Sequence, residues 1–474
     1  MRALRVGRKV SFASELKDTQ QESLGITTMR TGILACRFRR VRLVRTAWVA
    51  CTVAVLAPVA ALAQSAAAPT LTPNQQSALN AIAAICPKLG ALNKAQQLDP
   101  TEQQLFFRCN TILNQTTGLP SRNAALTAIS PEELNAAPRA NIDFGTAQSA
   151  SLVSRLLTLR EGSGTLGGSS GDESSSLSDG KLGTFFNIKD GFGSKDATAN
   201  ESEYDVKSKA ATLGADYRIT SSFVAGVALG YGWNKADFAV GGDLKTEGEM
   251  GSVYGSWYGE HQSLDLIATF GSFSNDSARQ ITYDITSPAR TDDIASTAYG
   301  TTRSHMTAAG LSYSYDFGQG GWRFGPTLAV DYLHVNVHAF SESSAQNPEL
   351  DLSYMPQGGI SVQIQPGFNV AYSLSTHWGV LTPYLRAVYV RETKTGQDSF
   401  EVRYLNDTKV AAEGVNTAFS VVADSPDRSY FRVAEGASMT FANNFSGFLD
   451  VESLLGYTSV KYSEVALGVR YQFH

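Results

Sequence analysis

Hydrophobic and polar positions alternate with a period of two from Lys181 to the end of the chain. The last segment shows the alternation most clearly, with apolar side chains at Val465, Leu467, Val469, Tyr471 and Phe473. Side chains of a β-strand point alternately to its two faces, so this pattern predicts strands with one apolar face. Small residues on one face and aromatic residues near the strand ends are typical of a lipid-facing barrel wall.

About twelve segments share this pattern, and the connections between them alternate in length. The strands are expected near 182–190, 204–219, 223–236, 246–258, 263–274, 303–317, 321–340, 358–375, 379–393, 428–442, 445–458 and 462–473. Short connections are expected at 220–222, 259–262, 318–320, 376–378 and 443–444, and long ones at 191–203, 237–245, 275–302, 341–357 and 394–427. Only the connection 459–461 is short where a long one is due. Outer-membrane barrels sort their connections in this way, whereas a soluble β-sandwich or propeller does not. We therefore predict an all-β fold, an antiparallel transmembrane β-barrel of about 12 strands over residues 181–474.

The period is helical in the preceding region, and residues 64–129 predict a small helical segment. Leu79, Ile82, Ala83 and Cys86 share one helix face. A second helix is expected to begin at Asp99-Pro100, an N-cap followed by proline, and its apolar face includes Cys109. One disulfide between Cys86 and Cys109 would staple the two helices, and two buried free thiols are the alternative.

Residues 130–180 predict a further helix and a linker. Ser130-Pro131-Glu132-Glu133 resembles a capping box, and residues 146–161 combine leucines with Arg155 and Arg160. Residues 162–180 are rich in Gly and Ser and have no capacity to form a core.

Residues 1–63 have the pattern of a secretory signal, with an arginine cluster, an apolar stretch at 47–60 and an Ala61-Leu62-Ala63 cleavage site. A membrane anchor is the alternative, and translation could instead begin at Met29. Residues 1–63 hold 11 of the 39 basic and 3 of the 44 acidic residues, so their removal leaves a formal charge of −13. A strongly acidic exported chain is a poor candidate for binding nucleic acid.

Several barrel segments carry a family resemblance. Phe185–Phe238, with Gly214–Arg218 and the spacing Gly226-x-x-x-Gly230-Tyr231, resembles the opening strands of the autotransporter β-domain family. Tyr254–Tyr258 and Gly468–Phe473 add to this resemblance, which covers about residues 130–474.

The resemblance implies a twelve-stranded translocator in the outer membrane of a Gram-negative bacterium. Its inner helix would thread the pore, with Arg155 and Arg160 meeting acidic lumen residues such as Asp450 and Glu452. The segment before that helix would be the exported passenger, whereas an exposed helix with solvated arginines is the alternative. The sequence departs from the family because the family usually carries a long β-solenoid passenger, and here only residues 64–129 precede the helix.

The C-terminal residues Tyr471 and Phe473 are expected to form the signal that the barrel assembly machinery reads. The sequence departs here from the usual aromatic terminus, because His474 follows Phe473. The other expected partners are outer-membrane lipid and lipopolysaccharide, and the barrel is expected to be a monomer.

Candidate chemistry is sparse, and we predict no enzyme, cofactor or metal site. Gly167–Gly171 matches the letters of Gly-x-Ser-x-Gly but lies in the Gly/Ser linker. His334 and His338 share one strand face about 13 Å apart, which is too far for one metal, and are interpreted as polar lumen lining. The acidic residues of 275–302 and 394–427 could bind cations or a partner, although solvated loops explain them as well.

The leading hypothesis is an autotransporter-type barrel that anchors or translocates its own short N-terminal segment. A diffusion pore with a periplasmic or plug domain is the alternative, followed by a barrel hydrolase or an adhesin.

Overall fold

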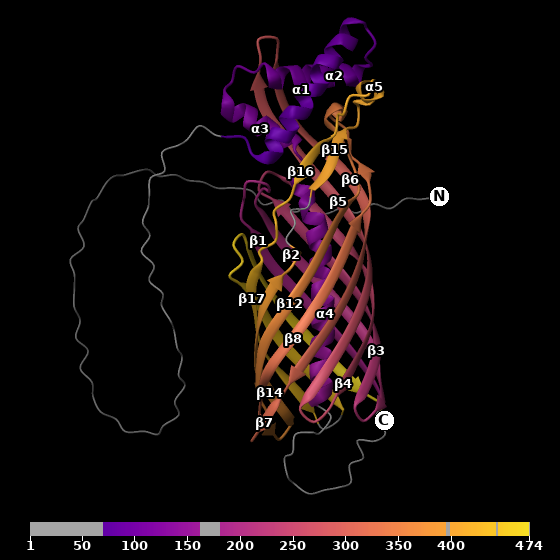
Figure 1. The fold of residues 1–474 in the computed structure, drawn as a ribbon, viewed down its shortest axis with the longest axis vertical. Helices are drawn as coiled ribbons and strands as arrows, with labels where there is room; N and C mark the ends of the chain where they lie inside the picture. The colour runs from indigo at the N-terminus through magenta and orange to yellow at the C-terminus, as the bar shows by residue number, and fades with distance from the viewer. Residues whose placement is uncertain (1–69, 162–180, 395–398, 442–443, 474) are drawn as a thin grey trace, which may run out of the picture. The chain divides into compact units, whose positions relative to one another are not determined.

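Twelve antiparallel strands form a closed barrel in the computed structural model of the chain (Figure 1). The structure describes residues 70–161, 181–394, 399–441 and 444–473, and of 157–161 it describes the backbone alone. The predicted signal at 1–63 and the linker at 162–180 therefore lie outside the described residues. The barrel strands are β1(Leu182–Lys195), β2(Tyr204–Thr220), β3(Phe223–Phe238), β4(Gly242–Tyr258), β5(Gln262–Thr286), β6(Thr291–Tyr315), β8(Trp322–Val337), β12(Gln357–Tyr372), β14(Gly379–Glu392), β17(Ser429–Phe441), β18(Phe445–Leu455) and β19(Val460–Gln472).

Each barrel strand pairs with its sequence neighbours, and β1 pairs with β19 to close the ring. The registers are regular, with a shift between Arg218 and Thr220 of β2. A closed ladder leaves no strand edge facing lipid, which a membrane-spanning sheet requires. Among the described residues, no helix has the length and hydropathy needed to span a membrane.

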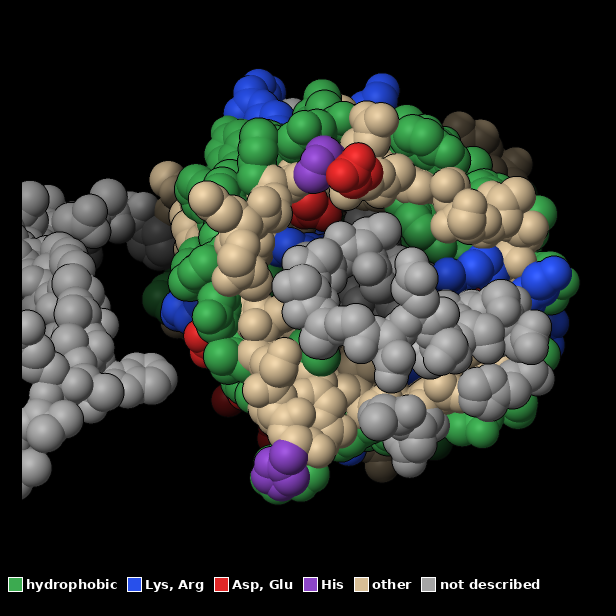
Figure 2. Space-filling model, turned by 90° about the horizontal axis from the view of Figure 1, so that it is seen from below, with side chains coloured by type: hydrophobic (Ala, Val, Ile, Leu, Met, Phe, Trp, Pro, Cys, Tyr) green, Lys and Arg blue, Asp and Glu red, His purple; other side chains and the backbone are tan. Residues whose placement is uncertain are grey.

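The outer wall of the barrel is apolar over its middle section. Leu229 is 70% exposed and Phe270 is 63% exposed, values that a water-soluble sheet would rarely tolerate. Viewed from the end that carries the short turns, hydrophobic side chains cover much of the outer rim (Figure 2). Inward-facing positions on the same strands hold buried polar residues such as Thr212, Ser252 and Asp265.

Short turns lie at one end of the barrel and the longer connections at the other end. Two of the predicted long loops are nevertheless wrong. The region 237–245 is a tight turn, because Gly241 and Gly242 adopt positive φ angles of 94° and 88°. The region 275–302 continues as the paired ends of β5 and β6, which turn at residues 287–290. Ile281, Tyr283 and Ile285 keep the period of two there and are buried.

Small elements fill the remaining connections. At the short-turn end lie β7(Phe317–Gln319) and β13(Leu374–Thr376). At the long-loop end lie β9(Phe340–Ser341), β10(Ser343–Ser344), η2(Pro348–Leu350), β11(Leu352–Tyr354), β15(Ser399–Tyr404), α5(Thr408–Ala412) and β16(Phe419–Val422). Strands β16, β15, β11 and β9 pair in that order into a second, four-stranded sheet, which we call the loop sheet.

Three helices cover the long-loop end and are called the cap: α1(Pro73–Lys94), α2(Pro100–Leu113) and α3(Leu119–Ile129). Thr72 and Gln75 form a capping box on α1, and Asp99 and Glu102 form one on α2. Helix α3 was not predicted. The capping box expected at Ser130 is wrong, because Ser130 ends α3 and a 3-10 turn, η1(Glu132–Asn135), follows without a side-chain cap.

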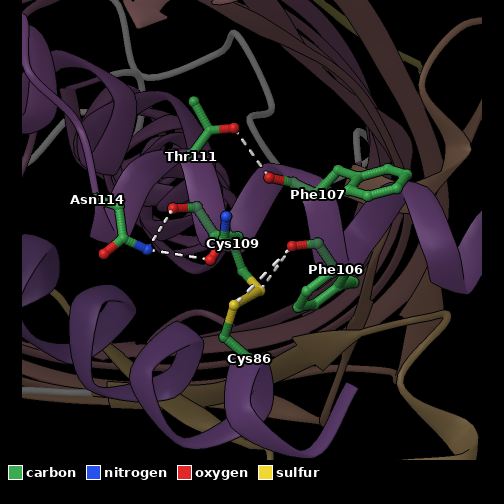
Figure 3. The surroundings of a disulfide bond; sticks show 7 residues. Cys86, Phe106, Phe107, Cys109, Thr111 and Asn114 are labelled. Carbon is green, nitrogen blue, oxygen red and sulfur yellow. Dashed lines mark hydrogen bonds between the residues drawn. A yellow bond between two sulfur atoms is a disulfide. The ribbon is translucent and has the colours of Figure 1, made fainter. Parts of the chain in front are cut away.

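The predicted disulfide joins Cys86 of α1 to Cys109 of α2, with Cα atoms 5.8 Å apart (Figure 3). Both cysteines are buried in one hydrophobic core with the cap, the ends of β5 and β6, and the loop sheet. Ile82, Leu105 and Leu126 represent the cap in this core, and Tyr354 and Val402 represent the loop sheet. The predicted fold is thus confirmed: a closed twelve-stranded barrel with a helical, disulfide-stapled N-terminal segment.

We expect the C86S/C109S variant to weaken the cap without affecting the barrel. The bridge closes a loop between cysteines 23 residues apart, and its loss should cost the cap about 3 kcal/mol. Hydrogen exchange of cap amides should accelerate accordingly, while the heat-dependent gel mobility of the barrel stays unchanged. Equal exchange in variant and wild type would show that the shared core alone holds the cap.

Candidate functional site in the barrel lumen and at its mouth

Helix α4(Ala136–Glu161) runs through the lumen from the long-loop end toward the short-turn end (Figure 1). It packs most closely against β4, β5 and β8. Phe144 stacks on Phe273 of β5 with ring centroids 5.3 Å apart. At about 1.5 Å per residue, its 26 residues reach roughly 39 Å, more than the height of an apolar membrane band.

Glycines allow the helix to approach the wall. A Cβ atom at Gly145 of α4 would lie 2.5 Å from the sulfur of Met306 and 2.7 Å from Leu333. On the wall side, a Cβ atom at Gly230 would lie 2.6 Å from the Gln148 amide oxygen. Any larger residue at these positions would push the helix away from the strands.

Polar side chains of α4 find partners on the same wall. Gln148 accepts a hydrogen bond from Thr212 at 2.8 Å and donates one to Ser252 at 3.1 Å. Asn141 accepts one from Ser304 at 3.0 Å. These buried hydrogen bonds specify the position of the helix, because shifting it by one residue would leave several polar groups unpaired.

Arg155 forms a buried ion pair with Asp216 of β2, with its guanidinium above the ring of Phe185. Arg155 thus meets an acidic lumen residue, as expected, but that residue is Asp216 and not Asp450 or Glu452. Asp450 accepts a hydrogen bond from Tyr384, and Glu452 pairs with Arg386 and Arg432, so barrel residues already occupy both carboxylates. The side chain of Arg160 lies outside the described residues.

A cavity of about 560 Å³ separates α4 from the wall of β17, β18 and β19. Arg139 and Asp143 of the helix and Arg432 and Glu464 of the wall line it. The helix therefore packs tightly on one half of the barrel and leaves a polar space along the other half.

Ion pairs and backbone hydrogen bonds join the cap to the barrel extensions. Arg108 of α2 contacts Asp292 at 2.5 Å and Glu349 at 3.0 Å, and all three side chains are buried. Lys409 of α5 contacts Glu102 of α2 at 2.5 Å. Removing one member of such a buried pair would leave an uncompensated charge, so these contacts fix the cap in one orientation.

Two further side chains, Asn74 and Arg279, form hydrogen bonds with backbone groups where the cap meets the rest of the chain. Asn74 of α1 accepts a hydrogen bond from the Val422 amide at 2.8 Å and donates one to the Val422 carbonyl at 3.0 Å. The side chain therefore pairs with the edge strand β16 much as another strand would. Arg279 of β5 donates to the Ala128 carbonyl at the end of α3 and pairs with Glu342.

Two buried carboxyl groups lie in η1, the joint between cap and lumen helix. Burial, together with the neighbouring Glu133, raises the pKa of Glu132 to about 8. Burial also raises the pKa of Glu133 to about 7, although the Arg279 guanidinium opposes the shift. Both carboxyl groups are therefore held wholly or partly neutral near pH 7 by the packing of the joint.

The remaining candidate residues lie on the outer wall of the barrel and on its strand extensions. His334 and His338 were expected to line the lumen, and this is wrong, since both are exposed on the outer face of the barrel. The described residues contain no group of three or more His, Cys, Asp or Glu side chains able to hold a metal ion. Asp276 accepts a hydrogen bond from Thr301 on the strand extension instead of lying in a loop. Tyr471 and Phe473 face outward at the short-turn end, with rings 5.0 Å apart.

Comparisons with known proteins agree with this architecture. The chain matches the family described as autotransporter beta-domain over residues 184–452. The translocator domain of the autotransporter NalP from Neisseria meningitidis superimposes with a TM-score of 0.50 at 15% identity, covering 70% of this chain and 98% of that structure.

Two curated relatives, each called esterase EstA, come from Pseudomonas aeruginosa and Pseudomonas putida. Each is 24% identical over 243 residues, which is 50% of this chain but 34% of the relative. The chain thus matches about a third of the length of these esterases. Because the family match covers more than half of the sequence, the chain belongs to the autotransporter β-domain family, a family of Gram-negative outer-membrane barrels.

Proposed function

We propose that this protein displays its own N-terminal segment on the cell surface and keeps it there. The barrel anchors the chain in the outer membrane, α4 carries the chain through the lumen, and the cap remains docked on the long-loop end. The observation that carries the proposal is the core that the cap shares with the ends of β5 and β6 and with the loop sheet.

The direction of α4 supports an exposed cap. The helix begins beside the cap and ends at the short-turn end, where β1 starts. Outer-membrane barrels keep short turns on the periplasmic side and long loops outside, so this arrangement supports a cap on the exterior. The cap and α4 are also continuous, because only Ser130, Pro131 and η1 separate α3 from α4.

The interface between the cap and the barrel extensions supports a cap that stays attached over one that is released. A passenger that is cut free would be expected to fold on its own, yet three short helices bury little core without the barrel extensions. Cap residues Ile82, Leu105 and Leu126 share their core with Tyr354 and Val402, and Arg108 would lose two buried partners on leaving.

The proposed role is non-enzymatic. We do not propose the esterase activity named for the two relatives, because the match covers 34% of their length. The letters Gly-x-Ser-x-Gly at 167–171 lie outside the described residues.

Protease digestion of intact cells tests the proposal. A recognition site for a sequence-specific protease is inserted after Gln96, in the exposed turn between α1 and α2. We expect cleavage on intact cells. The fragments should separate only under reducing conditions, because the Cys86–Cys109 disulfide bridges the cut. The matched control carries the same site at Ser221, in the short turn between β2 and β3, and should be cut only after lysis. Protection of the Gln96 site until lysis would overturn the proposal and favour a periplasmic or plug domain.

Docking of the cap should weaken as pH rises. Glu132 has a pKa of about 8 in the docked cap, against an ordinary value near 4.5 once exposed. The docked state therefore binds a proton more tightly, and its stability falls from about pH 4.5 up to about pH 8. We expect the free energy of cap opening, from hydrogen exchange corrected for intrinsic rates, to drop by about 1–3 kcal/mol over this window.

The E132Q variant should lose the part of this pH dependence that Glu132 causes, because glutamine stays neutral throughout, and Glu133 should cause the rest. E413Q is the matched control, since Glu413 is an exposed carboxylate that contacts Lys88 of α1 at 3.7 Å. An unchanged pH profile in E132Q would assign the effect to other groups.

A further inference from the structure

The outer faces of β6 and β8 carry a cluster of basic side chains that the proposed function does not use. Arg303 lies opposite His338, His305 opposite Asn336, and Thr307 opposite His334 in the β6–β8 ladder. The rings of His305 and His338 are 5.1 Å apart. All four basic side chains are exposed, and we call Arg303, His305, His334 and His338 the β6/β8 basic patch.

The patch lies directly above the lipid-facing part of the wall. Below it on the same outward faces are Leu311, Leu328, Val330 and Tyr332, each between 41% and 49% exposed. Phe324, near the opposite end of β8, is ten positions before His334. With a strand rise of 3.3 Å and a tilt of 35–45°, this spacing is about 25 Å along the barrel axis. That is the height of the apolar band of an outer-membrane barrel, so the patch lies at the level of the outer-leaflet headgroups.

Carboxylates are absent from the patch itself. The outward residues of β6 from 301 to 307 and of β8 from 332 to 338 are Thr, Arg, His, Tyr and Asn. On the neighbouring strand β5, Asp276 lies opposite Thr301 and accepts its hydrogen bond at 2.8 Å. Arg303 is therefore an exposed cation with no carboxylate among the outward residues of the patch, in a chain with an excess of acidic residues.

The outer faces of β2, β3 and β4, which β5 separates from the patch, show what a compensated surface looks like. Lys207, Lys235 and Lys245 form one outward row across β2, β3 and β4. Asp237 pairs with Lys235 at 2.5 Å, and Asp243 pairs with Lys245 at 3.2 Å. Glu247 and Glu249 lie exposed beneath this row on β4. The lysine row is therefore neutralised within the protein, whereas the β6/β8 basic patch is not.

We propose that the β6/β8 basic patch binds a phosphate of an outer-leaflet phosphoglycolipid, the lipid A portion of lipopolysaccharide, with the acyl chains lying along the apolar strip below. A guanidinium matches phosphate oxygens with two parallel hydrogen bonds. An imidazole donates a hydrogen bond to phosphate in either protonation state. The strip of Leu311, Val330 and Tyr332 continues into the patch without a break, as a single amphiphile requires.

A bound lipid would also brace the strands that carry the cap. Arg303 belongs to β6, whose far end forms the β5–β6 extension beneath α2 and α3. A phosphate held between Arg303 and His338 would therefore link β6 to β8 on the outside, where α4 already links them on the inside.

Native mass spectrometry of the purified full-length protein in detergent tests the proposal. The probes are bisphosphorylated lipid A, enzymatically dephosphorylated lipid A and phosphatidylcholine. Wild type should bind bisphosphorylated lipid A most tightly. The R303Q/H305Q/H338Q variant should bind it about tenfold more weakly, because it loses the charge-assisted hydrogen bonds from these side chains to the phosphate. The K207Q/K235Q/K245Q variant, matched in number and level, should stay within about twofold of wild type.

Three outcomes would overturn the proposal. One is equal affinity of the patch variant and wild type. Another is an equal loss in the lysine variant, which would indicate a general charge effect. The third is displacement of lipid A by millimolar inorganic phosphate, which would indicate a free-anion site. Heat-dependent gel mobility establishes in each case that the variant barrel is folded, so a loss of binding is not a loss of fold.

Discussion

Every backbone amide and carbonyl that faces lipid must find its partner within the protein, and closure of the twelve-stranded ladder meets this requirement. Closure also creates a lumen, and twelve tilted strands enclose more space than their own side chains fill. Helix α4 occupies that space with a face of small and polar residues that interlock with β2 to β6 and β8. The helix thus fills the lumen that closure creates, and it also connects the cap at one end of the barrel to the start of β1 at the other end.

The extensions of β5 and β6 support the cap. They continue the barrel ladder beyond the membrane band, and their inward faces change from polar lumen residues to Ile281, Tyr283 and Ile285. These residues complete a core that the cap could not form alone, and Arg108 fixes its orientation through Asp292 and Glu349. Barrel and cap therefore depend on each other for a complete core, and η1 connects the cap to α4. Burial in η1 keeps the carboxyl groups of Glu132 and Glu133 wholly or partly neutral.

The sequence predicted elements whose signals are local. The period of two located all twelve strands, and the Asp99-Pro100 signal located the start of α2. It did not predict features that depend on register. Arg155 pairs with Asp216 because this β2 residue faces the lumen at the depth of the arginine, and that depth depends on the register. The outward direction of His334 and His338 reverses with a shift of one residue, so polarity alone misassigned them to the lumen. The sequence predicts a loop at 275–302, where the structure has the extensions of β5 and β6, because the residues that cover their inner face lie far away in the chain.

Cysteine cross-linking in isolated outer membranes tests most directly whether α4 lies in the lumen against β2. Gln148 and Thr212 share a hydrogen bond of 2.8 Å, so a short, reducible thiol cross-linker should join the two cysteines of the Q148C/T212C variant. The cross-link should change the gel mobility until reductant is added. The matched variant Q148C/L213C places the second cysteine on the lipid-facing side of the same strand, where the side chain is 58% exposed, and should remain unlinked. Failure of Q148C/T212C to cross-link, or equal cross-linking in the two variants, would contradict the account.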